Sequence, residues 1–156
     1  MDLEKLKSQY KKLQEKYNLP EFKEINDAFE IDRIERETDR LLREIRKTML
    51  EKIVGYIRLI ELIISPAQAS PVFMILVKEV SSNDKLILDN VIKEFAILEL
   101  NSFKLDIEST EDEEAKEIKN IITAWEKTKE DLKSIIKMME RNWKSTNQKR
   151  DRNYFS

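Results

Sequence analysis

The stretch MLEKIVGYIRLIELII, residues 49–64, decides the fold. Eleven of its sixteen residues are apolar; the others are Glu51 and four residues at every third position, which are Lys52, the only glycine Gly55, Arg58 and Glu61. On a helix those four positions form one narrow stripe, and the rest of the circumference is mostly apolar. Such a helix is buried by neighbours on several sides. The stretch therefore predicts a helical bundle with residues 49–64 as its central buried segment.

The composition of the chain favours helices throughout. Of the 156 residues, 38% are charged and 40% apolar, with one Gly and three Pro. So few chain breakers leave little room for tight β-turns or phosphate-binding loops. Cys and His are both absent, which removes disulfides, thiolate sites and the commonest general base. We therefore expect an all-α protein of ordinary domain size that is not an enzyme and holds no cofactor.

No segment of the sequence predicts a membrane protein. The opening MDLEKLKSQY lacks the apolar core of a secretory signal. Residues 49–64 are too few to span a bilayer, and they include Lys52, Arg58 and Glu61. We expect a cytoplasmic protein without a membrane partner.

The first half of the chain predicts three helices. Apolar residues spaced three and four apart give residues 2–17 one apolar edge. Pro20 ends that helix, and a short helix around Phe22 to Phe29 follows. A long helix is then predicted over 31–64, with a solvated first half and a buried second half. Gly55 costs about 1 kcal/mol relative to Ala inside a helix, so we expect a neighbouring helix to approach it closely.

The second half predicts three more helices and a tail. Ser70 and Pro71 are typical of a helix start, so 72–80 is interpreted as a short buried helix, with a strand as the alternative. A second core helix is predicted over about 83–105. Thr110 and Glu113 form a capping box before a helix over 111–144, whose apolar residues repeat every seven positions. We predict an antiparallel bundle in one domain, residues 1–144, with a flexible, extended basic tail over 145–156.

Two charged clusters were considered as binding sites. Arg33, Arg36, Arg40, Arg43 and Lys47 share one helix face that could follow a phosphate backbone, but each has an acid four residues away. We therefore interpret this basic stripe as a salt-bridged surface. Residues 106–117 resemble a calcium loop in spacing, but Glu111 occupies the position that requires glycine. The capping box explains the same acids without a metal.

Glu61 and Glu99 lie in apolar helices and could form a carboxylate metal site if buried together. Such sites also use histidine, which this chain lacks, so a metal-binding protein is the third hypothesis. The tail is the strongest functional signal. Residues 141–152 hold five Lys and Arg against one Asp, net +4, so the rest of the chain is net −6. Contact with RNA or an acidic protein is predicted for these residues: Arg141, Lys144, Lys149, Arg150, Arg152, Tyr154 and Phe155.

The segments LPEF (19–22), REIRKTMLEKI (43–53) and EEAKEIKNIITAWEKTKEDLKSIIKMM (113–139) resemble uncharacterised small all-helical proteins of archaea. The resemblance implies a cytoplasmic protein and carries no catalytic or binding residue over to this chain. The leading hypothesis is a non-enzymatic adaptor or assembly protein that binds a protein partner or itself through apolar helix edges. Those edges are expected on 2–17, on the first half of 31–64 and at the far end of 111–144. The alternative is an RNA- or ribosome-associated factor that uses the basic tail.

Overall fold

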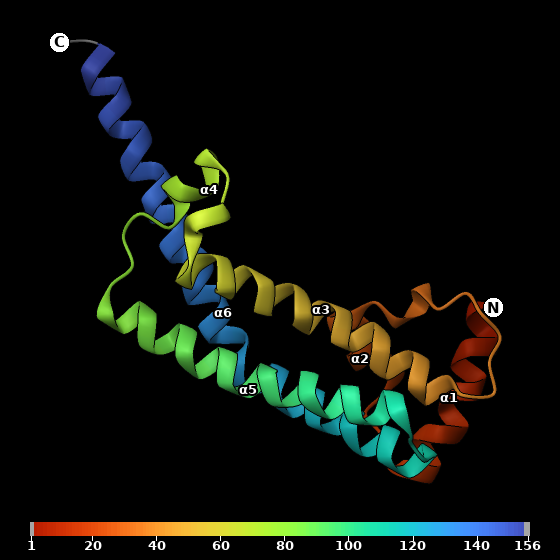
Figure 1. Ribbon diagram of the computed structural model, residues 1–156. Helices are drawn as coiled ribbons and strands as arrows, with labels where there is room; N and C mark the ends of the chain where they lie inside the picture. Colours follow the sequence, from red (N-terminus) through yellow and green to blue (C-terminus); the bar gives the residue numbers. More distant parts are fainter. Residues whose placement is uncertain (1, 155–156) are drawn as a thin grey trace. The chain divides into compact units, whose positions relative to one another are not determined.

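The computed structural model describes residues 2–154, with side chains up to Arg152, and its regular secondary structure is entirely helical (Figure 1). The predicted all-α class is confirmed, and the antiparallel order of the helices stays a prediction. The helices are α1 (Leu3–Tyr17), α2 (Phe22–Phe29), α3 (Leu41–Ile64), α4 (Pro71–Leu76), α5 (Ser82–Ile107) and α6 (Glu111–Tyr154). Two short 3-10 turns, η1 (Ile31–Arg33) and η2 (Pro66–Gln68), follow α2 and α3. Among the described residues, none of the helices is long and apolar enough to cross a bilayer.

The residues form two compact units. Unit 1 comprises the chain up to Gly55 together with Phe95–Glu126, and unit 2 comprises Tyr56–Glu94 together with the chain from Lys127. Helices α3, α5 and α6 each contribute one part to each unit. Unit 1 has 16 Lys and Arg against 22 Asp and Glu, net −6, and unit 2 has 13 against nine, net +4. The two units therefore carry opposite net charge.

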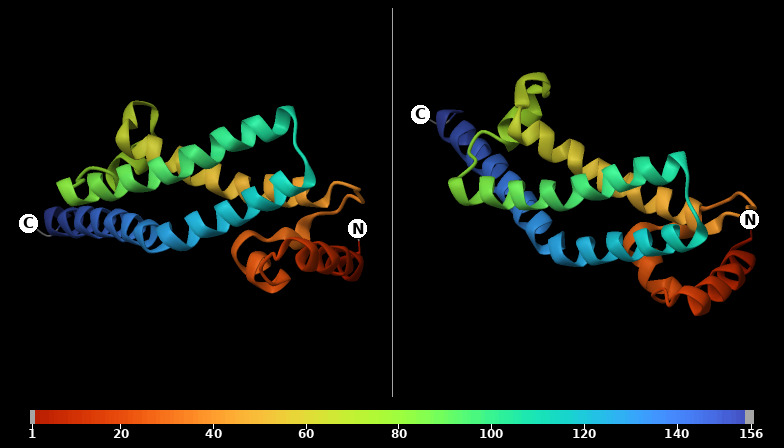
Figure 2. Two further views of the ribbon diagram at one scale, coloured as in Figure 1. Left: turned by 90° about the horizontal axis from the view of Figure 1, so that it is seen from below. Right: turned by 60° about the horizontal axis from the view of Figure 1, so that its bottom comes forward.

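In unit 1, α1 and α2 form a small helical pair (Figure 2). Asn18 adopts a left-handed backbone (φ 52°), which ends α1 two residues before Pro20. The hydroxyl of the buried Tyr10 donates to the Pro20 carbonyl over 2.7 Å, and its ring packs edge-on against Phe22 at 5.6 Å between centroids. The predicted helices over 2–17 and Phe22 to Phe29 are confirmed.

The core of unit 1 is built from α3 and α6. The α3 side chains Leu42, Ile45, Met49 and Ile53 are at most 2% exposed, as are Ile118 and Ile121 of α6. At the edge of this core the Phe29 and Trp125 rings lie 5.5 Å apart between centroids. The Lys52 ammonium sits 4.7 Å from the centre of the Trp125 ring, which is a cation–π contact.

The predicted start of the long helix at Ile31 is wrong, because α3 begins at Leu41. Glu30 takes a left-handed backbone (φ 54°) that ends α2, and only one 3-10 turn follows. Ile31 and Ile34 are both buried, and their burial holds this irregular segment against the rest of unit 1. The Thr38 hydroxyl then accepts a hydrogen bond from the Arg40 amide just before α3. Tertiary burial therefore outweighs the local helical charge pattern here.

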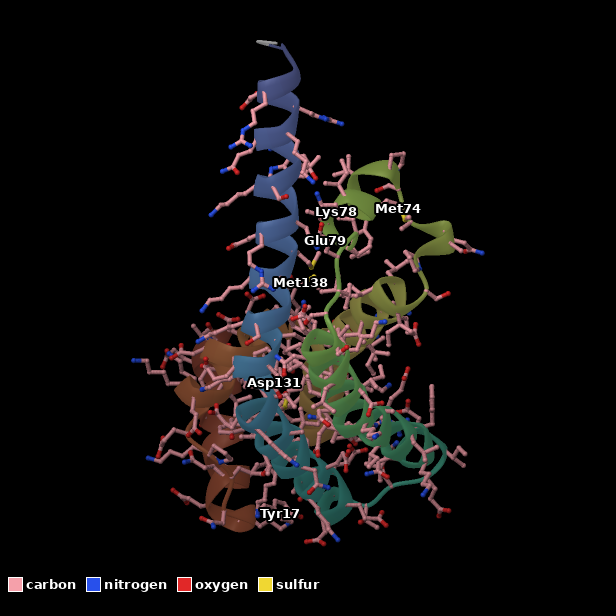
Figure 3. All side chains as sticks on the ribbon, turned by 90° about the vertical axis from the view of Figure 1, so that its left-hand side faces the viewer. Tyr17, Met74, Lys78, Glu79, Asp131 and Met138 are labelled. Carbon is pink, nitrogen blue, oxygen red and sulfur yellow. The ribbon has the colours of Figure 1, made fainter. Side chains whose placement is uncertain are left out.

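In unit 2, α4 is held against α6. The Ser70 hydroxyl caps α4 by accepting from the Phe73 amide over 3.2 Å, so the predicted start of this short helix is confirmed. The predicted burial and the predicted extent to residue 80 are wrong, because α4 ends at Leu76 and none of its residues is buried. The buried Asn142 of α6 donates to the carbonyls of Leu76 (2.7 Å) and Glu79 (3.1 Å). In Figure 3, Lys78 and Glu79 lie beside the part of α6 that carries Met138.

The predicted extended tail is wrong, because residues 145–154 continue α6. Extending an existing helix avoids the cost of nucleation, so even polar residues can propagate it. The Lys78 ammonium also donates to the Thr146 hydroxyl over 2.6 Å, which ties this end to the segment after α4. The side chain of Tyr154 and all of Phe155 lie outside the described residues.

The central stretch 49–64 is buried along one row rather than all round. Met49, Ile53, Ile57, Ile60 and Ile63 are at most 5% exposed, which confirms the segment as core. Two of its large apolar side chains are solvent-exposed, Leu62 at 37% and Ile64 at 60%. The interpretation of Gly55 is wrong, because a Cβ atom built there would meet nothing within 4 Å.

Candidate interaction surfaces

The outer side of α5 exposes a row of large apolar side chains in unit 1. Ile97, Leu100, Phe103 and Ile107 are 60%, 56%, 61% and 88% exposed. They fall at successive helical turns, so they lie on one face of the helix. We call these four residues the α5 outer row.

The opposite side of α5 carries the buried row that was predicted for a core helix. Leu88, Val91, Phe95, Leu98 and Ser102 are at most 4% exposed, and their spacing is three and four residues. A helix with apolar residues on both sides can bury only one of them in a small domain. The prediction of a second core helix over about 83–105 is therefore correct for one face only, because Leu86 and Phe103 in this range are exposed.

A buried charge cluster joins α3, α5 and α6 beside the outer row. The side chain of Arg46 is fully buried, and its guanidinium donates to Glu114, Ser102 and Asp106, the last over 2.7 Å. The Ser109 hydroxyl donates to Glu114 over 2.6 Å. All these residues belong to unit 1, and the cluster fixes the end of α5 that carries Phe103 and Ile107.

The protonation of Arg46 is set by two opposed effects. Burial by itself lowers the pKa of its guanidinium, but the hydrogen bonds and charges of Glu114 and Asp106 raise it above its usual value overall. Arg46 is therefore a permanent cation held between carboxylates. Its burial was not predictable from the sequence, because a single Arg on an otherwise apolar helix face has no local signal of burial.

A second apolar surface lies in unit 2, between α4 and α6. It is a groove of about 390 Å³ lined by Val72, Leu76, Ile136, Met139, Glu140 and Trp143. Val72 is 57% exposed, Ile136 40% and Trp143 39%. The groove includes the far end of 111–144, where an uncovered apolar edge was expected.

The other two expected apolar edges are covered. On α1, Leu6 and Tyr10 are buried, although Leu3 is 40% exposed. In the first half of the predicted 31–64 helix, Leu41, Leu42 and Ile45 are buried. These edges pack within unit 1, whereas the α5 outer row and the α4–α6 groove remain open to partners.

The predicted basic residues of the tail are exposed and helical. Arg141, Lys144, Lys149, Arg150 and Arg152 all lie on the last turns of α6. Arg141 and Lys144 were predicted to be helical, whereas extended chain was predicted for the other three. Arg141 approaches Asp84 of α5 at 3.9 Å, a distance at which the pairing is weak.

The basic stripe predicted over residues 33–47 does not form. Arg33 precedes α3, and its guanidinium bonds to Glu51 over 2.6 Å, rather than to Glu37 as the helical spacing predicted. Glu37 instead accepts from Lys5 of α1, and Arg43 bonds to Asp106 of α5. Arg33 and Arg43 are therefore neutralised through tertiary pairs rather than through the predicted i,i+4 pairs.

The acidic residues at the α5–α6 junction either cap the start of α6 or bind the buried Arg46. The Glu113 carboxylate accepts from the Thr110 amide over 2.8 Å, and the Thr110 hydroxyl accepts from the Glu113 amide over 3.3 Å. The predicted capping box is therefore confirmed. Asp106 and Glu114 bind Arg46. Among the described residues, no three metal-ligating side chains gather.

The two carboxylates of the hypothetical metal site are not buried together. Glu61 is exposed in unit 2, and Glu99 is half-buried in unit 1. The buried carboxylates are instead Glu114 and Glu117, both on α6. One oxygen of Glu117 accepts from Asn120 (3.0 Å) and Asn101 (3.4 Å), while the other accepts no hydrogen bond from the described residues.

Comparison with known proteins adds no assignment: no family model, curated protein or solved structure matches this chain.

Proposed function

We propose that the protein is a non-enzymatic helical assembly protein that associates with a second copy of itself through the α5 outer row. The observation that carries the proposal is the exposure of this row, in which four large apolar residues within eleven positions are each more than half exposed. A contiguous apolar patch of this kind marks an interaction site more often than a feature of an isolated chain.

The size of the row suits a dimer interface. Four such side chains at these exposures present roughly 500 Å² of apolar surface, and each partner in a standard interface buries about 800 Å². The row would therefore supply the apolar centre of an interface, with polar neighbours at its rim. The nearby buried pair of Arg46 and Glu114 holds the underlying helix end in one position. A rigid face loses less entropy on binding than a mobile one.

The charges along the row favour a second copy. Beside Phe103 and Ile107 the exposed residues Lys104 and Glu108 carry opposite charges. Two copies that meet here pair unlike charges more favourably than like ones, because like charges at an interface disfavour association. Self-association also requires no further component, because a second copy is always present.

Sedimentation velocity over a range of protein concentrations tests the proposal. We expect a concentration-dependent dimer, and we expect Leu100→Ser combined with Phe103→Ser to weaken it at least a hundredfold, because two apolar side chains no longer leave water. The matched control is Val72→Ser, an equally exposed apolar position in unit 2, which should leave the dimer unchanged. A protein that stays monomeric at all concentrations, or equal effects of both changes, would overturn the proposal.

A further inference from the structure

We propose that the α4–α6 groove of unit 2 binds an acidic amphipathic helix of another protein. The groove is lined by the aliphatic side chains of Val72, Leu76 and Ile136, together with Met139 and Trp143. A concave apolar strip between two helices is the form of site into which the apolar face of a third helix fits.

The lining residues are types that dominate the energy of such interfaces. Trp143 is 39% exposed, so its indole ring remains available to a ligand. Tryptophan is the residue most enriched among those that carry binding energy. Met139 beside it is flexible and polarizable, which lets the groove adjust to different apolar side chains.

The charges around the groove select an acidic partner. Unit 2 is net +4. Lys137 and Lys144 directly follow Ile136 and Trp143 on α6, and both are exposed. Arg150 is seven residues beyond Trp143, so it lies two turns further along the same helix face. Glu140 is the acidic residue of the lining. A helix with acidic residues flanking its apolar stripe would therefore meet mostly positive charge.

The shape of the site favours a helix over a bilayer or a nucleic acid. A bilayer surface is broad, so it suits an extended apolar face, whereas this apolar surface is a short strip between α4 and α6. Single-stranded RNA is held by aromatic side chains on which successive bases stack. Here Trp143 is the aromatic residue of the lining, and most of the other lining residues are aliphatic.

This site is independent of the self-association proposed above. The α5 outer row belongs to unit 1 and the groove to unit 2. A chain with Leu100→Ser and Phe103→Ser should bind the acidic helix as well as the original chain does. Conversely, changes in the groove should leave the dimer intact. Either proposal can therefore fail without the other.

The test uses two synthetic peptides and the full chain. One peptide is an amphipathic helix with Leu along one face and Glu on the flanks, and the other replaces every Glu by Lys. Calorimetry should show binding of the Glu peptide that weakens as salt is added, and at least tenfold weaker binding of the Lys peptide. The emission of Trp143 should shift to shorter wavelength when the Glu peptide binds, because the indole leaves water.

Variants then locate the binding site. Val72→Ser with Ile136→Ser should weaken Glu-peptide binding at least tenfold. Lys144→Gln with Arg150→Gln should weaken binding and reduce its salt dependence. Trp143→Phe should remove the emission shift, because the other tryptophan, Trp125, lies in unit 1. All these side chains are exposed to solvent, so the fold should tolerate the changes.

Several results would overturn the proposal. Equal affinity for the two peptides would show that charge does not select the ligand. Unchanged affinity in the Val72→Ser/Ile136→Ser variant would show that the peptide does not bind in the groove. Failure of the original chain to bind the Glu peptide would also overturn the proposal. Tighter binding of single-stranded RNA, or of phosphatidylglycerol vesicles, with the same Trp143 response would assign the surface to that ligand instead.

Discussion

Arg46 and Glu114 form an ion pair inside unit 1, although 68 residues separate them in the sequence. Their side chains are 0% and 4% exposed. Ser102 and Asp106 complete the hydrogen bonds of the guanidinium, and Ser109 adds one to the carboxylate. Removing either partner of a buried charge pair lowers stability strongly, because the remaining charge is then buried and unpaired.

Replacing Arg46 by Leu should therefore be severely destabilising. The Glu114 carboxylate would remain buried without its cation, and we expect the free energy of unfolding to fall by about 3–5 kcal/mol. Urea unfolding followed by circular dichroism measures this change.

The matched control for this variant is Lys5→Ala, which breaks the exposed pair with Glu37 and should cost less than about 1 kcal/mol. Replacing Arg46 and Glu114 together by Leu should recover part of the loss, since no buried charge is then left at this pair. If the double variant loses as much free energy of unfolding as Arg46→Leu and Glu114→Leu lose in sum, the two side chains are not coupled.

Tyr10 should make the stability of the protein fall at alkaline pH. Burial raises the pKa of its phenol well above the usual value, with smaller contributions from Glu21 and Glu24. In the unfolded chain this phenol ionises at about pH 10, while in the folded chain it keeps its proton above that pH. The folded state then binds more protons than the unfolded state, so stability is full below about pH 10 and decreases above it.

Urea unfolding at about pH 8 and at about pH 11 tests this expectation. Tyr10→Phe should lose about 1 kcal/mol at the lower pH, because the hydrogen bond to the Pro20 carbonyl is gone. The same variant should lose less stability than the original chain between the two pH values. An identical loss in both proteins would mean that other groups cause the alkaline dependence.

Gly55→Ala should stabilise the protein by about 1 kcal/mol. Gly55 lies inside α3, is exposed, and has open space where the Cβ would be. Alanine in a helix interior is more stable than glycine by about that amount, chiefly because glycine loses more backbone entropy. Thermal unfolding measures the change, and Ala96→Gly at an exposed position inside α5 should give a change of the opposite sign. A destabilised Gly55→Ala variant would point to a constraint at this position that the structure does not contain.

Asn142→Ala should loosen the segment after α4. The Asn142 amide satisfies the carbonyls of Leu76 and Glu79, and its loss should cost about 1–3 kcal/mol. Amide hydrogen exchange should become faster around these two residues. Asn142→Asp should be worse, because a carboxylate cannot donate to either carbonyl and would face both with negative charge. If Asn142→Asp were the milder change, these two contacts would not be what holds the segment.

Local sequence patterns predicted most helices and two of their caps. The apolar spacing over residues 2–17, the Ser70 start of α4 and the Thr110–Glu113 capping box all depend on neighbours within a few positions. Such interactions are determined by helix geometry alone. They could therefore be predicted without knowledge of the tertiary structure.

Long-range partners were not predictable in this way. The segment from Arg33 to Arg40 has ideal helical charge spacing, yet Lys5 binds Glu37 and Glu51 binds Arg33. An exposed i,i+4 pair contributes only about 0.3–0.5 kcal/mol, so burial of Ile31 and Ile34 can override several of them. The continuation of α6 past residue 144 was missed for a related reason, because nothing local predicts the contact between Lys78 and Thr146.

The order of the residues by itself determined that this chain is helical, where several of its helices begin, and that residues 49–64 contribute to the core. Which face of α5 would be covered was decided only by tertiary packing, because both faces of that helix are apolar and α3 and α6 can cover only part of it. The same packing placed Arg46 among carboxylates far away in the chain. Helix formation depends on neighbours a few residues apart, whereas the choice of a buried face depends on which other surfaces the folded chain brings against it.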